Sequence, residues 1–196
     1  MPKLGMPPIR REQLIRATLE TIDQVGLADA TIAEIAGRAG LSAGIISHYF
    51  GGKDGLLNAA MRRILRQLHD AVAERVAAAG ESPRDKLRAI IDGNFDSTQV
   101  NPAAMRVWLT FWAASMHDAQ LRRLQHANDR RLQSNLAHYF RRVLPASEAQ
   151  KAARGLAAMI DGLWLRGSLA GGEFDVARAR HTAYEYLDHY LPKSAH

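Results

Sequence analysis

Residues 31–50 read TIAEIAGRAGLSAGIISHYF, and this stretch decides the fold of the N-terminal part of the chain. Thr31, followed three residues later by Glu34, predicts the capped start of a short helix. Gly40 predicts a tight turn, because glycine adopts backbone conformations that a Cβ makes costly. Ser42 is expected to cap a second short helix. Two short helices joined by a glycine turn are typical of a helix-turn-helix unit, although an ordinary helical hairpin has the same spacing.

The apolar residues of this stretch are expected to form a small core that fixes the angle between the two helices. They are Ile35, Ala36, Leu41, Ile46 and Phe50. In a helix-turn-helix unit, the second helix lies in the major groove of DNA. That helix contains no Arg, Asn or Gln, which are the usual bidentate readers of base edges.

Outward from this stretch, the apolar periodicity is helical, and we find no convincing strand. Gly26 is expected to end a first helix that starts near Arg10. Six helices are predicted after residue 53, which gives about nine in all. We expect an all-α protein with two parts, an arm and helix-turn-helix DNA-binding domain in residues 1–52, and a ligand-binding and dimerisation bundle in residues 53–196. Side chains predicted to cap later helices are Asn101, Asp118, Ser147 and Asp175.

The composition excludes several classes of protein. The chain has 196 residues with 26 Lys+Arg, 20 Asp+Glu and no cysteine, so disulfides, thiol nucleophiles and cysteine-ligated metals are excluded. The formal charge of +6 suits a polyanionic partner but suits a merely soluble surface equally well. No apolar run approaches the roughly 18 residues of a membrane helix, and the N-terminus lacks the apolar core of a signal peptide. We therefore expect a cytoplasmic protein.

An enzyme is not expected. The eight histidines do not form a metal-ligand spacing, and no phosphate-binding loop or nucleophile elbow is present. We accordingly expect no catalytic residues, no metal and no cofactor.

Three motifs near the N-terminus resemble the signature of the TetR family of transcriptional repressors. They are Gly40-Leu41-Ser42, His48-Tyr49-Phe50, and Lys53 followed by Leu56-Leu57. The arm, the stretch from Gly44 to Phe50, Phe111-Trp112 and residues 161–166 resemble most the members that repress betaine synthesis.

The resemblance implies which residues contact operator DNA. The base-reading positions fall on Ala43, Gly44, Ile45, Ser47, His48 and Tyr49. Thr31 and Lys53 match positions that grip phosphates, and Ser42 offers another hydroxyl. Without long polar readers, base recognition is expected to use Ala43 and Ile45 against thymine methyl groups.

A basic N-terminal arm is expected to add minor-groove contacts, as homeodomain arms do. Its cations are Lys3, Arg10 and Arg11. For Lys3, a solvated tail is an equally good interpretation.

The resemblance also implies an effector pocket in the bundle, with choline as the expected effector. A quaternary ammonium donates no hydrogen bonds, so its selectivity needs aromatic faces and often a carboxylate. Trp108 and Trp112 share one helix face, and Asp161 is the first carboxylate candidate ahead of Asp92 and Asp96. Further candidates are Phe95, Phe111, Tyr139 and Trp164. The aromatic residues could equally be plain core, and Asp161 could instead pair with an arginine.

The family likeness further implies a homodimer in which the last two helices of each chain form a four-helix bundle. Gly155, Gly162 and Gly167 would allow close approach of the helices, either between subunits or within one. Such a dimer would repress genes for choline uptake and glycine betaine synthesis, and choline or betaine aldehyde would relieve repression. The alternatives are a TetR-type repressor of an efflux gene that responds to lipophilic cations, and a helical dimerisation protein without DNA binding.

Overall fold

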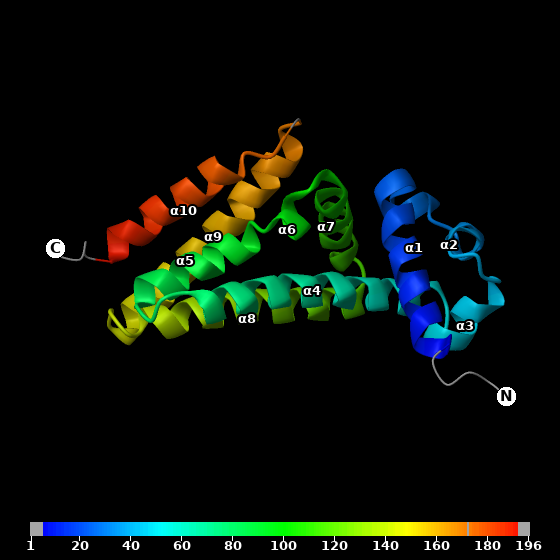
Figure 1. The fold of residues 1–196 in the computed structure, drawn as a ribbon, viewed down its shortest axis with the longest axis horizontal. Coiled ribbons are helices and arrows are strands. Elements are labelled where there is room, and N and C mark those ends of the chain that lie inside the picture. Colours follow the sequence, from blue (N-terminus) through cyan, green and yellow to red (C-terminus); the bar gives the residue numbers. More distant parts are fainter. Residues whose placement is uncertain (1–5, 172, 192–196) are drawn as a thin grey trace. The chain divides into compact units, whose positions relative to one another are not determined.

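The computed structural model describes residues 6–171 and 173–191, and the regular structure of this part is entirely helical (Figure 1). Ten helices follow one another in these residues, compared with the nine expected. The additional one is α6, a single turn. The helices are α1 (Met6–Asp29), α2 (Ile32–Arg38), α3 (Gly44–Phe50), α4 (Lys53–Ala78), α5 (Pro83–Asn94), α6 (Ser97–Val100), α7 (Pro102–Ser115), α8 (Ala119–Phe140), α9 (Ala146–Leu169) and α10 (Val176–Tyr190).

Most of the predicted caps are present. The Thr31 hydroxyl accepts a hydrogen bond from the Glu34 backbone N–H at 3.1 Å. Asn101, Asp118 and Asp175 likewise accept from backbone N–H groups in the first turns of α7, α8 and α10. These side chains satisfy donors that a helix start leaves without an internal partner.

The predicted serine caps are wrong. Ala43 precedes α3 and Pro145 precedes α9, and neither supplies a side-chain cap. In the first case the chain has already turned into helical geometry at Ala43, with φ −58° and ψ −32°. Ser42 therefore contributes its backbone carbonyl, which accepts from the Ile45 N–H at 3.1 Å.

Helix α1 begins earlier than predicted, at Met6, so Pro7 and Pro8 lie in its first turn, where proline is tolerated. The predicted break at Gly26 is confirmed, because this residue has φ 79° and ψ 173°. Only a short helical turn follows it.

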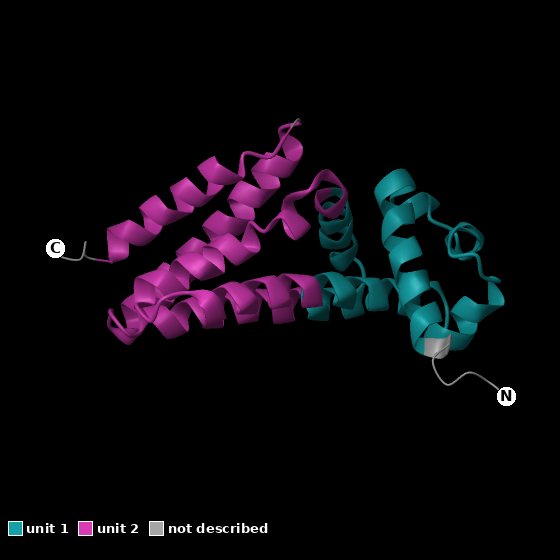
Figure 2. Ribbon diagram, in the orientation of Figure 1, with its two compact units in different colours: residues 1–65, 106–124 teal, residues 66–105, 125–196 magenta. Residues whose placement is uncertain are grey.

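Packing divides the chain into two compact units (Figure 2). The first comprises residues 1–65 and 106–124, and the second comprises residues 66–105 and 125–196. Helix α4 is continuous from Lys53 to Ala78. This division by packing does not follow the predicted functional division at residues 52 and 53, which remains a prediction.

In the first unit, α2 packs against α1 and α3. The expected core of the helix-turn-helix is present in part, since Ile35, Ala36 and Ile46 are buried while Leu41 and Phe50 are half-buried. Burial of these apolar side chains holds the two short helices at a fixed angle.

In the second unit, α10 packs against α5 and α9. Ion pairs and a hydrogen bond between side chains link α10 to α5. Asp188 pairs with Arg84 and Arg88, and Asp92 pairs with Arg180 at 3.2 Å and accepts the Tyr184 hydroxyl. Among the helices of the described part, none is long and apolar enough to cross a membrane.

Candidate DNA interface and effector site

Helix α3 presents one face to solvent and one to the core. Ile46 is completely buried. The predicted base-reading positions Ala43, Gly44, Ser47 and His48 are exposed, and Ile45 and Tyr49 are half-buried. The structure therefore places all six of these residues on or beside the exposed side of one seven-residue helix.

The predicted phosphate contacts lie on the elements that flank α3. Thr31 and Ser42 are exposed. Lys53 is half-buried at the start of α4, and its ammonium lies 3.4 Å from the Leu27 carbonyl oxygen. An ammonium has three donors, so this contact leaves Lys53 able to bind a second acceptor.

The predicted arm requires a correction. Arg10 and Arg11 are not in an extended arm, because α1 already begins at Met6 and includes both residues. Lys3 lies outside the described residues.

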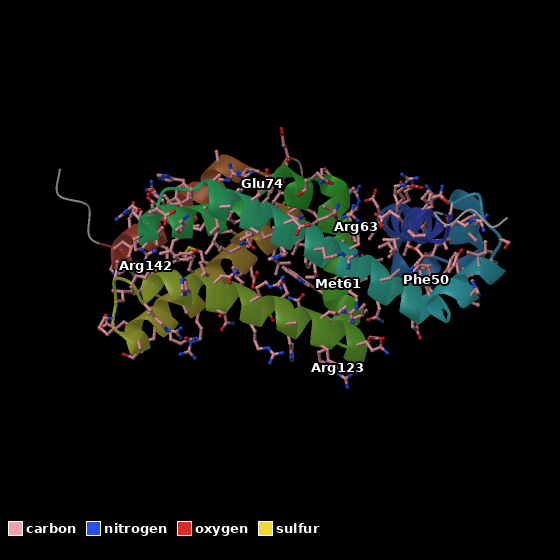
Figure 3. The ribbon with its side chains drawn as sticks, turned by 60° about the horizontal axis from the view of Figure 1, so that its bottom comes forward. Phe50, Met61, Arg63, Glu74, Arg123 and Arg142 are labelled. Carbon is pink, nitrogen blue, oxygen red and sulfur yellow. The ribbon has the colours of Figure 1, made fainter. Side chains whose placement is uncertain are left out.

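Arg11 makes contacts that its position in the sequence did not reveal. Its Nη1 donates a hydrogen bond to the Tyr49 carbonyl oxygen at 2.5 Å, and its Cζ lies 4.5 Å from the centroid of the Phe50 ring. Figure 3 labels Phe50 where α3 ends and α4 begins. The guanidinium of α1 is thus attached to the C-terminal end of α3.

The predicted aromatic set is divided between the two units. Trp108, Phe111 and Trp112 lie on α7 in the first unit, where Phe111 is fully buried. The rings of Trp108 and Trp112 have centroids 6.4 Å apart and planes inclined at 58°. Trp108 and Trp112, which were predicted to share one helix face, thus form a tilted pair of indole rings.

The remaining aromatic candidates belong to the second unit. They are Phe95, Tyr139 and Trp164. Phe95 is fully buried and stacks on Phe174 at 6.0 Å, which gives it a packing role. Trp164 is also buried, on α9, and Tyr139 is half-buried on α8.

Asp161 is open to solvent on one side and crowded by protein on the other. Its side chain is exposed, yet desolvation by the surrounding protein and, secondarily, the charge of Asp129 raise its pKa to about 6. It forms no ion pair within the described part of the chain, so pairing with an arginine does not account for it.

Asp129 is a further carboxylate near Asp161, and it was not predicted from the sequence. It lies half-buried on α8 and accepts a hydrogen bond from Gln125 Nε2 at 2.9 Å. Desolvation raises its pKa, while the charge of His126 and the Gln125 hydrogen bond partly oppose that shift. The spacing of Gln125 and Asp129, one helix turn apart beside an apolar stripe, was the available signal.

The two weaker carboxylate candidates have structural partners. Asp92 is held by Arg180 and Tyr184. Asp96 pairs with Arg75 at 2.5 Å and caps α6. Burial opposes ionisation of Asp96, but hydrogen bonds from Arg75 and Thr98 outweigh it and lower its pKa.

A concave surface of about 550 Å³ lies along α4 and α6 in the second unit. Of the nine residues considered for the effector site, Asp96 alone lines it. Its lining residues are Gln67, Asp70, Ala71, Glu74, Arg75, Ala78, Asp96 and Thr98. This surface has no aromatic wall, so it does not match the chemistry expected for a quaternary ammonium.

Two of the three glycines considered for dimerisation serve packing within one chain. A Cβ at Gly155 would lie 1.9 Å from the Tyr186 hydroxyl, and one at Gly167 would lie 1.9 Å from the Phe174 ring. A Cβ at Gly162 would meet no atom within 4 Å. Gly162 therefore remains the one of the three that is available to a second copy of the chain.

These features define a class of protein, namely helix-turn-helix transcriptional regulators. The buried side of α3 fixes its orientation, and its other side is free to enter a major groove. Residues 14–60 match the family of bacterial regulatory proteins of the tetR type, and residues 83–192 match the family described as BetI-type transcriptional repressor, C-terminal.

Two relatives agree with this class over 96% or more of their length. The HTH-type transcriptional regulator BetI of Stenotrophomonas maltophilia is 66% identical over 100% of both chains. BetI 1 of Chromohalobacter salexigens is 69% identical over 99% of this chain and 96% of that one. The chain therefore belongs to the BetI-type repressors of the TetR family, which are transcriptional regulators and not enzymes.

Among solved structures, a transcriptional regulator from Saccharomonospora viridis in complex with choline has a TM-score of 0.80. The match covers 93% of this chain and 97% of that one at 22% sequence identity, so it shows a shared fold.

Proposed function

We propose that this repressor binds its operator as a homodimer in the cytoplasm and controls genes for choline uptake and glycine betaine synthesis. Choline or betaine aldehyde binds the effector domain and releases the DNA. Residues 1–52 form the DNA-binding domain in this proposal, and residues 53–196 bind the effector and the second subunit.

The exposed side of α3 supports the DNA-binding part of the proposal. Ala43 and Ile45 offer apolar contacts to thymine methyl groups, and Ser47 and His48 offer hydrogen bonds to base edges. We assign the phosphate contacts to Thr31, Ser42, Tyr49 and Lys53, whose hydroxyl and ammonium groups are donors to phosphate oxygens. Specificity from such short side chains depends on accurate placement of α3 in the groove.

The observation that carries the effector assignment is the tilted pair formed by Trp108 and Trp112 on α7. Indole faces are the strongest aromatic partners for a quaternary ammonium. Phe111 lies on the same helix and is the further aromatic member that we assign to this pair. In the second unit, Tyr139 and Trp164 are the aromatic candidates, and Asp161, ionised above a pKa of about 6, is the candidate countercharge. The choline complex of the Saccharomonospora viridis regulator supports the same class of ligand for this fold.

The exposed side of α9 supports dimerisation. Ala158 and the two leucines Leu165 and Leu169 are exposed there, with Leu165 37% and Leu169 69% exposed. In contrast, Ala179, Ala183 and Leu187 of α10 are buried within the chain. We therefore assign the apolar part of the dimer contact to α9, around Gly162.

Release of DNA follows from linkage. An effector weakens DNA binding only if it binds the conformation that is unsuited to DNA more tightly than the DNA-bound one. Helix α4 is continuous from Lys53, which follows the end of α3, to Ala78, and we assign it the role of lever.

The test is fluorescence anisotropy of labelled DNA taken from upstream of the protein's own gene, at a stated salt concentration because phosphate contacts make affinity salt-dependent. We expect tight binding that exceeds binding to a scrambled duplex and that choline or betaine aldehyde reverses. Release by large lipophilic cations instead would favour the efflux alternative. Absence of specific binding would refute the operator assignment.

Two pairs of variants locate the sites within the same assay. Trp112→Leu should weaken choline-dependent release by about tenfold, whereas Trp112→Phe, which keeps an aromatic face, should weaken it less. His48→Ala should lower affinity for the operator, and the exposed His69 of α4 provides the matched His69→Ala control. Equal effects within either pair would contradict the corresponding assignment.

Sedimentation analysis tests the dimer. Leu165→Arg should shift the protein toward monomer, because it places a charge in the apolar contact. An unchanged dimer with this variant would exclude this side of α9 as the interface.

A further inference from the structure

Arg11 is attached to the end of the reading helix by two contacts of different kinds. Its Nη1 donates to the Tyr49 carbonyl oxygen at 2.5 Å, and its guanidinium carbon lies 4.5 Å from the Phe50 ring centroid. Arg11 and Tyr49 are 38 residues apart in sequence. The contacts therefore join α1 to α3 and are not local to either helix.

The C-terminal end of α3 needs such a partner. The last carbonyl groups of a helix accept no hydrogen bond from within the helix, and they carry the negative end of the helix dipole. Gly51 ends α3 in the left-handed region with φ 75°, and its N–H bonds the Ser47 carbonyl. The Tyr49 carbonyl is thereby left for Arg11, whose positive charge complements the negative helix end.

A helix as short as α3 is weak by itself. It has seven residues, fewer than a helix needs to be stable alone, and Ile46 is its buried anchor. An anchor in the middle of a helix fixes its depth but leaves rotation about that point less restrained. Arg11 supplies a second point of attachment, at Tyr49 and Phe50.

We propose that Arg11 is a positioning residue that orients α3 for base reading, and that it does not bind a DNA phosphate. The planar guanidinium rests on the Phe50 ring while one of its N–H groups is used by the Tyr49 carbonyl. The guanidinium has five N–H groups and the Tyr49 carbonyl uses one of them, so the salt dependence of DNA binding distinguishes this role from a phosphate contact. The proposal rests on the DNA-binding function proposed above.

The test combines DNA binding with hydrogen exchange of the free protein. The variants are Arg11→Met, Arg11→Lys and the control Arg16→Met, which alters another exposed arginine of α1. Anisotropy is measured on the duplex from upstream of the gene and on a scrambled duplex of the same length, each over a range of salt concentrations. Amide exchange is followed for residues 44–51.

For Arg11→Met we expect faster exchange in residues 44–51 and a loss of about tenfold in the preference for the specific duplex over the scrambled one. The salt dependence of binding should be unchanged, because no phosphate contact is removed. Arg11→Lys should recover part of the preference, since it retains the charge at the helix end. Arg16→Met should behave as wild type.

Two results would overturn the proposal. One is a similar loss on both duplexes with a salt slope lowered by about one per subunit and unchanged exchange, which is the signature of a lost phosphate contact. The other is wild-type exchange and wild-type preference in Arg11→Met. If the wild-type protein does not prefer the specific duplex, the operator assignment fails, and exchange in residues 44–51 decides the role of Arg11 independently.

Discussion

Gly55 allows α4 to start close to the end of α3. It lies in the first turn of α4, and a Cβ at this position would lie 1.8 Å from the Phe50 carbonyl oxygen and 2.9 Å from the Phe50 carbonyl carbon. Both atoms are backbone, so no rotamer change relieves the overlap. We predict that Gly55→Ala destabilises the protein and displaces the end of α3.

The magnitude follows from the distance. Contacts of a Cβ shorter than 3.0 Å are essentially absent from real structures, so the Phe50 carbonyl must move by about 1.2 Å. Forcing an extra methyl group into a packed position costs about 1–3 kcal/mol, and a deep overlap with backbone atoms lies in the upper part of this range, at about 2–3 kcal/mol. The better helix propensity of alanine returns at most about 1 kcal/mol. The expected net loss is about 1–2 kcal/mol, or a fall in Tm of roughly 3–6 °C for a chain of this size.

Thermal unfolding at one fixed protein concentration measures the effect, because the stability of a dimer depends on concentration. Gly37→Ala is the matched control. Gly37 lies in α2, and a Cβ there would meet no atom within 4 Å. Without an overlap, Gly37→Ala should stabilise the protein by up to about 1 kcal/mol.

The two substitutions are chemically identical, so opposite signs would isolate the contact with Phe50. The reasoning is refuted if Gly55→Ala raises Tm as Gly37→Ala does. A lowered Tm without any change in the DNA preference would show that the strain is absorbed by α4 and not by α3.

Three further changes test other parts of the structure. Asp161→Asn should raise Tm near pH 7.5 and lose that advantage toward about pH 4. The folded-state pKa of Asp161 is raised from 3.8, so ionisation of this carboxyl destabilises the folded protein as pH rises. Equal gains in Tm at both pH values would contradict the raised pKa. Asp92→Asn should lower the free energy of unfolding by about 1–2 kcal/mol, since Arg180 and Tyr184 lose their anionic partner; an unchanged urea midpoint would argue against it. Thr31→Ala should cost about 1 kcal/mol in thermal or urea unfolding through the lost cap on α2, and Thr31→Ser should restore most of it; equal stability of the two variants would exclude the cap.

Local signals in the sequence predicted most of the helical architecture. Thr31, Asn101, Asp118 and Asp175 cap helices as predicted, because a side-chain cap involves only residues two or three positions apart. Ser42 failed as a cap because the preceding turn, and not the local residue type, decided where α3 begins. The single turn α6 was missed because four residues contain no apolar period to detect.

Candidate residues for the DNA interface were also accessible from sequence, because a motif assigns positions along one short helix. The role of Arg11 was not, because its contact with Tyr49 joins residues 38 positions apart. The same limit explains why the proximity of Asp129 to Asp161 was not predicted and why Gly155 could not be assigned to one chain or two. Such contacts exist only after the helices have packed.

The amino-acid sequence by itself determined the all-helical class, the helix-turn-helix unit and the family, since these depend on periodicity, on turn residues and on short motifs. Tertiary structure alone decided that the end of α3 is held by a guanidinium from α1. It also decided that Asp161 is a crowded carboxyl with a raised pKa. The physical reason is that burial, charge proximity and close approach depend on distances in space, which helix packing creates between residues far apart in the chain.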